Sequence, residues 1–194
     1  MARDPAPRVD APKQRLFLAV DVPRSAGQVV AAAIRPWREA FPKARWVAPE
    51  NWHVTLKFLG WTAERLVPWV EETVAGIVDA QHPITARVQG LGAFPSTRRG
   101  RVLWAGIDDP ADSFAALVED LETGLREEFR AEIRRFHPHL TVARSEPPLR
   151  LPDSYADTPL ASESFVAEEV VLFRSHVQRR STRYESLRAF PLGG

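Results

Sequence analysis

Cysteine is absent from this 194-residue sequence, and long apolar runs are absent too. Without cysteine the chain has no disulfide, no thiolate nucleophile and no cysteine-ligated zinc, which suits a reducing cytoplasm. The apolar run Leu16 to Val20 is closed by Asp21, far short of the ~18 residues of a membrane span. We therefore expect a soluble, cytoplasmic protein with no membrane partner.

An excess of charge of either sign is also missing, since 26 basic and 25 acidic residues give a net charge of +1. No overall field draws such a chain to duplex DNA, so any nucleic-acid contact must be local. Two short basic turns are candidates for guiding an RNA backbone, although charged hairpin tips are common without any such role. They hold Arg98, Arg99 and Arg101, and Arg179, Arg180 and Arg183.

Residues 1–14 mix prolines with charges of both signs and are expected to form a flexible tail. Residues 15–194 have the length and apolar content of one domain, for which a monomer suffices. Apolar residues alternate with polar ones in some segments and recur at helical spacing in others, which predicts an α+β fold. The expected strands are 15–22, 46–47, 53–59, 84–94, 102–107, 139–143, 165–177 and 184–190, and the expected helices are 25–40, 66–78 and 112–129.

The sequence repeats itself at an offset of 86 residues. This shift carries 15–19 onto 101–105, and carries His53-Val54-Thr55-Leu56 onto His139-Leu140-Thr141-Val142, with no gap between the two matches. A two-unit repeat predicts two pseudo-symmetric lobes, each an antiparallel sheet with helices on its outer face. The active groove is then expected between the lobes.

Each repeat carries one His-x-Thr strand, and the two residues share a face because side chains alternate along a strand. His53 and Thr55 would thus face the groove, with Val54, Leu56 and Phe58 turned toward the helices. Two imidazoles can supply an acid and a base together near neutral pH, which suits phosphoryl transfer. A lone histidine in a strand is usually structural, so the catalytic interpretation depends on the recurrence of His-x-Thr in both repeats.

Asn51 to Gly60 and Phe136 to Arg144 resemble the two signatures of the two-histidine phosphoesterase superfamily, and 15–23 is similar to the opening strand of its RNA 2′,3′-cyclic phosphodiesterase (2′-5′ RNA ligase) branch. The late segments 172–175 and 183–187 look like that branch's closing strands. The resemblance implies a two-lobed enzyme without metal or cofactor. Its implied reaction opens a 2′,3′-cyclic phosphate at an RNA end to a 2′-phosphate, with 2′-5′ joining as the reverse.

The resemblance also implies residue roles. His53 would donate a proton to the leaving 3′-oxygen and His139 would accept one from water, although the two labels are exchangeable on sequence alone. Thr55 and Thr141 would bind phosphate oxygens. Arg144 is a further phosphate-binding candidate, but simple alternation puts it on the face opposite His139, so a bulge is required.

Other interpretations remain open. His137-Pro138-His139 is a possible chelating pair, yet no cysteine or suitably spaced carboxylate supports a metal site. The chain could instead be a noncatalytic RNA-end or nucleotide-binding protein, or act on a smaller cyclic phosphate such as an ADP-ribose derivative. Phe58, Trp46 and Tyr184 are candidates for stacking on a base, although the pattern favours a core position for Phe58.

Overall fold

The computed structural model describes residues 12–177 and 182–193. Its helices are α1 (Arg24–Ala40), α2 (Val67–Val78) and α3 (Ser113–Gly124), with short 3₁₀ turns at Pro49–Asn51, Glu64–Leu66, Thr97–Arg99 and Asp153–Tyr155. Its strands are β1 (Lys13–Asp21), β2 (Arg45–Trp46), β3 (His53–Ala63), β4 (Ile84–Phe94), β5 (Gly100–Asp108), β6 (His139–Leu149), β7 (Phe165–Ala167), β8 (Glu169–Val177) and β9 (Thr182–Pro191).

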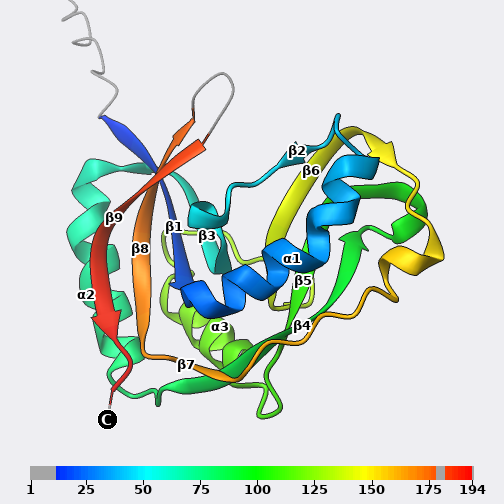
Figure 1. Ribbon diagram of the computed structural model, residues 1–194. Coiled ribbons are helices and arrows are strands. Elements are labelled where there is room, and N and C mark those ends of the chain that lie inside the picture. Colours follow the sequence, from blue (N-terminus) through cyan, green and yellow to red (C-terminus); the bar gives the residue numbers. More distant parts are fainter. Residues whose placement is uncertain (1–11, 178–181, 194) are drawn as a thin grey trace, which may run out of the picture.

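The strands pair antiparallel in the order β7-β4-β5-β6-β3-β1-β8-β9, with β2 added beside β6. Within the described residues the two halves of this sheet join at a single registered pair, Val54 with Leu140. Figure 1 shows β1, β3, β8 and β9 on one side of that junction and β4, β5 and β6 on the other. The predicted α+β class is confirmed, whereas a pseudo-twofold relation of two lobes stays a prediction.

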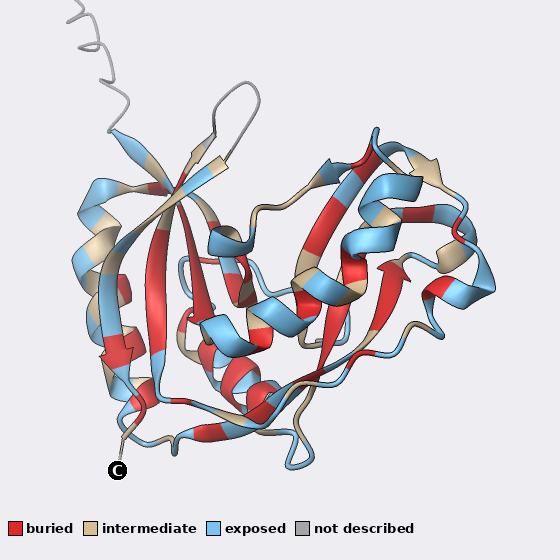
Figure 2. Cartoon of the chain, viewed as in Figure 1, coloured by how far each residue is buried: buried red, intermediate tan, exposed pale blue. Residues whose placement is uncertain are grey.

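Each of two helices packs on the half of the sheet that belongs to the other repeat. α1 follows β1 in the chain but contacts β4, while α3 follows β5 but contacts β3 and α2. Their buried faces follow the helical spacing, as with Val30 and Ile34 of α1 and Leu117 and Leu121 of α3. Figure 2 shows the buried band running along the sheet and under these helices. This exchange makes the two halves share one core.

The strand pairing shows that the two matches of the repeat do not share one offset. Ala143 of β6 pairs with Leu103, and Lys57 of β3 pairs with Leu18. Because 57 and 143 are 86 apart while 18 and 103 are 85 apart, the repeat needs a one-residue gap between its two matches. The prediction of a single offset was wrong, since one apolar strand looks the same when it slides by a residue.

Several element boundaries also differ from the prediction. β6 runs on to Leu149 through residues expected to form a loop, and α3 ends at Gly124 although Phe129 is still buried. Asp112 does not cap α3 with its side chain; Asp109 Oδ2 accepts the hydrogen bond from Phe114 N–H at 2.7 Å. β1 begins at Lys13, inside the expected tail, and residues 1–11 of that tail lie outside the described residues.

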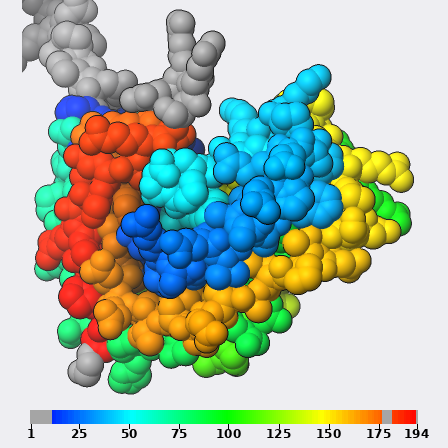
Figure 3. All heavy atoms as spheres, in the orientation of Figure 1, coloured from blue at the N-terminus to red at the C-terminus, as the bar shows by residue number. Residues whose placement is uncertain are grey.

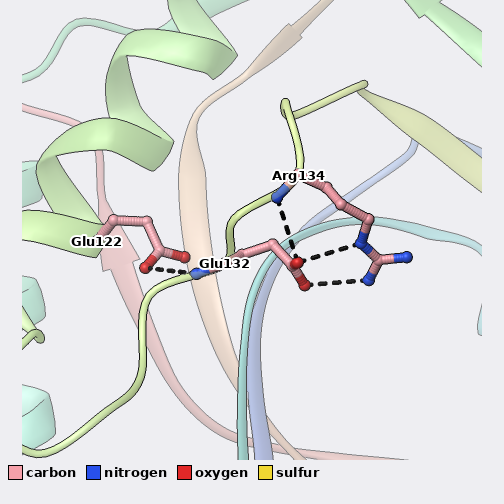
Figure 4. Close-up of polar contacts among 3 residues, drawn as sticks. All are labelled: Glu122, Glu132 and Arg134. Carbon is pink, nitrogen blue, oxygen red and sulfur yellow. Dashed lines mark hydrogen bonds and ion pairs between the residues drawn. The ribbon is translucent and has the colours of Figure 1, made fainter.

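Lys57 and Glu122 form an ion pair beneath the sheet. The Nζ and Oε2 atoms lie 2.5 Å apart, and the Lys57 side chain is only 2% exposed. Glu122 also accepts a 3.4 Å hydrogen bond from the backbone N–H of Glu132, whose carboxylate pairs with Arg134 (Figure 4). Glu122 lies on the glutamate-rich side of α3, a pattern typical of a solvent-facing surface, and here it ties α3 to β3.

No described helix is long and apolar enough to cross a membrane.

Candidate active site

The two His-x-Thr strands meet where the halves of the sheet join. The antiparallel Val54–Leu140 pair places Thr141 beside His53 and His139 beside Thr55. Val54 and Leu140 are themselves fully buried toward the helices. Alternation therefore turns both histidines and both threonines to the opposite, partly open face, so the fold brings together all four residues that the sequence singled out.

Both imidazoles are held by the same local device. His53 Nδ1 lies 2.9 Å from the carbonyl oxygen of Asn51, and His139 Nδ1 lies 2.7 Å from that of His137. A carbonyl only accepts, so each Nδ1 carries the hydrogen and donates it. This fixes the tautomer and leaves Nε2 of each ring as the nitrogen that can exchange a proton.

Aromatic rings flank each histidine. Phe17 and Tyr184 lie 4.9 Å and 5.1 Å from the His53 ring, centroid to centroid, and Phe94 lies 5.1 Å from the His139 ring. The pKa of His53 is lowered to about 4, mainly by this burial. The hydrogen bond to the Asn51 carbonyl opposes the shift, and the nearby charges of His139 and Arg144 add to it.

Burial likewise lowers the pKa of His139, with His137 and Arg144 acting in the same direction. Both rings are thus neutral near pH 7 in the free protein. The Val54–Leu140 pair sets the two rings diagonally across the junction, each next to the threonine of the other repeat.

A groove of about 540 Å³ opens on this face. His53, Thr55, Thr141 and Arg144 line it, whereas His139 does not and instead lies against Phe94. The other lining residues are Arg15, Leu16, Phe17, Val47, Asn51, Phe58, Gly60, Ser175, Thr182 and Tyr184. Figure 3 shows the face of the molecule on which α1, in blue, and the following residues 41–52, in cyan, lie in front.

A β-bulge in each repeat changes which side chains face the groove. The register of β6 skips Val142 and that of β3 skips Leu56, so Ala143 and Lys57 are both buried as the alternation resets. Arg144 therefore points to the groove. The skipped residue Val142 is the bulge that the predicted role of Arg144 required. Phe58 holds the equivalent position and is 61% exposed, so the expectation that it faces the helices was wrong.

The remaining candidates separate clearly. Tyr184 lines the groove, whereas Trp46 does not and donates its indole N–H to the Phe41 carbonyl at 3.1 Å. Of the basic turns, Arg98, Arg99, Arg101 and Arg183 are exposed, with Arg101 paired to Glu146, while Arg179 and Arg180 lie outside the described residues.

Arg15, Phe17 and Asn51 are among the lining residues that sequence reasoning missed. The first two belong to a strand whose apolar run hides which members face the groove, and Asn51 lies in a 3₁₀ turn. Asn51 Nδ2 donates a 3.3 Å hydrogen bond to the Thr182 carbonyl, which ties this turn to β9. Its place two residues before His53 was the one available signal.

The suggested metal pair His137 and His139 has its rings among aromatic side chains, with Trp104 only 4.9 Å from His137. In residues 12–177 and 182–193, no three His, Cys, Asp or Glu side chains are grouped to hold a metal ion.

The antiparallel sheet and the pair of His-x-Thr strands at its centre define a two-histidine phosphoesterase. The family model described as LigT like Phosphoesterase matches residues 20–104 and 106–184, and the chain belongs to this family.

Among its relatives, an RNA 2′,3′-cyclic phosphodiesterase of Methanothermobacter thermautotrophicus is 32% identical over 93% of this chain and 100% of its own length. One of Geobacillus stearothermophilus is 29% identical over 94% of this chain, which spans only 58% of that relative's length. A crystal structure of a Thermus thermophilus protein superposes with a TM-score of 0.76 at 29% identity, covering 93% of this chain and 98% of that one.

Proposed function

We propose that this protein hydrolyses the 2′,3′-cyclic phosphate at an RNA end to a 2′-phosphate, without a metal ion. The observation that carries the proposal is the register of β3 against β6, which puts His53, Thr55 and Thr141 in one groove and His139 beside Thr55 on the same face of the sheet. The activity named for the relatives supports the same substrate.

In the proposed reaction, His139 Nε2 takes a proton from water as the water oxygen attacks phosphorus. The bond from phosphorus to O3′ breaks, and His53 Nε2–H gives its proton to that oxygen. The products are a 2′-phosphate and a free 3′-hydroxyl. Each positioned proton transfer contributes about 10²–10⁴-fold in rate.

The nonbridging oxygens gain negative charge during this step. The Thr55 and Thr141 hydroxyls and the Arg144 guanidinium are the donors that line the groove to receive it. His53 must hold a proton when substrate is bound, although burial keeps its pKa near 4 in the free protein. An anionic phosphate beside the ring favours the imidazolium and so raises that pKa.

The same groove can join RNA ends by the same ring opening. A 5′-hydroxyl replaces water as the nucleophile, His139 takes its proton, and a 2′-5′ linkage forms as O3′ leaves with a proton from His53. All the groups named lie in one chain, so a monomer is sufficient.

The direct test is incubation of the purified protein with adenosine 2′,3′-cyclic phosphate in excess chelator, followed by chromatography. We expect steady conversion to adenosine 2′-phosphate. Binding without turnover would instead favour a nucleotide-binding protein. Turnover restricted to an ADP-ribose cyclic phosphate would move the substrate to another class, and activity abolished by the chelator would contradict metal independence.

A further inference from the structure

Trp61 is an exposed tryptophan that the reaction above does not use. It lies on β3, beyond Phe58, and 68% of its surface is exposed. An indole left this open has no packing role in the described residues, and a large exposed aromatic beside a binding groove is a feature that points to a ligand.

A second irregularity in β3 sets the direction of this side chain. Phe58 and Trp61 are three residues apart, so plain alternation would place them on opposite faces. The register of β1 with β3 skips Leu59, and Gly60 takes the left-handed conformation at φ 69°. Trp61 consequently returns to the face of Phe58, while Leu59 and Thr62 are buried on the other side.

The positions paired with these residues on β1 both line the groove. Phe17 pairs with Phe58, and Arg15 pairs with Trp61 two residues further along. Paired residues of an antiparallel ladder share a face, so Trp61 lies next to Arg15 on the side of the sheet that carries the groove. The ring of Phe17 lies 4.9 Å from that of His53 and 6.2 Å from that of Phe58, and Trp61 is the next residue of β3 on the same face.

Aromatic rings interleaved with arginine are the pattern that holds single-stranded nucleic acid, because every base stacks and every linkage carries a charge. A cyclic phosphate occupies the 3′ end of an RNA, so only the preceding nucleotides remain to be placed. We propose that Trp61 stacks on a base of the nucleotides preceding the cyclised one, with Arg15 on the phosphate between them. This inference rests on the proposed function and adds that the enzyme prefers RNA ends to mononucleotides.

The test compares kcat/KM for adenosine 2′,3′-cyclic phosphate with that for a trinucleotide ending in the same cyclised adenosine. We expect the wild type to favour the trinucleotide, and Trp61→Ala to lower the ratio of the two constants about tenfold, as the loss of one stacked base requires. Trp61→Phe keeps a ring and should retain most of the preference. Val166→Ala, on the exposed edge strand β7, is the control and should leave the ratio as it is.

Mononucleotide hydrolysis in the wild type tests the proposed function by itself, so the two ideas fail separately. A Trp61→Ala ratio within twofold of wild type would overturn the stacking role. If that unchanged ratio comes with a sedimentation coefficient of Trp61→Ala that differs from the wild-type value, the stacking role is likewise overturned. Trp61 is then assigned to contact with a second copy of the chain.

Discussion

Replacing either His53 or His139 with alanine is expected to lower kcat/KM for adenosine 2′,3′-cyclic phosphate by about 10²–10⁴-fold. In the proposed reaction each ring makes one proton transfer through Nε2, because Nδ1 of each ring is committed to a backbone carbonyl. The rates are measured by initial velocities over a range of pH, with circular dichroism to confirm that the variants fold.

The double variant distinguishes a shared step from two independent effects. If both rings act on one phosphorus centre, removal of the second costs little once the first is gone, and the double variant is close to the slower single variant. His82→Gln, at an exposed histidine away from the groove, is the matched control and should keep wild-type rates. Near-wild-type turnover in either alanine variant would refute the assignment.

Glu122→Leu is expected to reduce the free energy of unfolding by about 3–5 kcal/mol, because it leaves the Lys57 ammonium buried without its carboxylate. Lys57→Met should cost less, since the Glu122 side chain is 18% exposed and can keep water contact. Urea unfolding followed by tryptophan fluorescence measures both values.

The double variant Lys57→Met with Glu122→Leu completes the comparison. Two apolar side chains of similar size commonly replace a buried ion pair at little cost, so we expect stability within about 1 kcal/mol of wild type. Arg87→Leu, which removes a partner from the exposed ion pair with Asp108, serves as the control and should have a small effect. Equal losses for Glu122→Leu and Arg87→Leu would show that the Lys57 pair is not buried in solution.

The sequence carried enough information to predict the α+β class and the placement of the two His-x-Thr strands side by side. Both follow from an apolar period and from a polar motif that recurs far along the chain. Glu122 shows a limit of that reasoning. A carboxylate on a charged helix face is expected to be exposed, but the fold places Lys57, 65 residues away in the sequence, against it.

Bulges explain the larger errors about the site. An inserted residue reverses the alternation beyond it, and neither Leu56 nor Val142 is distinguished by type from an ordinary strand residue. Arg144 and Phe58 therefore could not be placed by counting. Gly60, with its left-handed backbone, was the one sequence signal for such a reversal, and it bears on Trp61.

The central claim is that both imidazoles face one phosphate. It is tested most directly by following the histidine ring signals of the free and the adenosine 2′-phosphate-bound protein by NMR across pH. In the free protein burial holds the pKa of His53 at about 4 and that of His139 below its ordinary value, so both rings gain protons only in acid. A bound phosphate favours the protonated form of each ring, and we expect both pKa values to rise on binding. A rise at one ring alone, or at neither, would contradict the account.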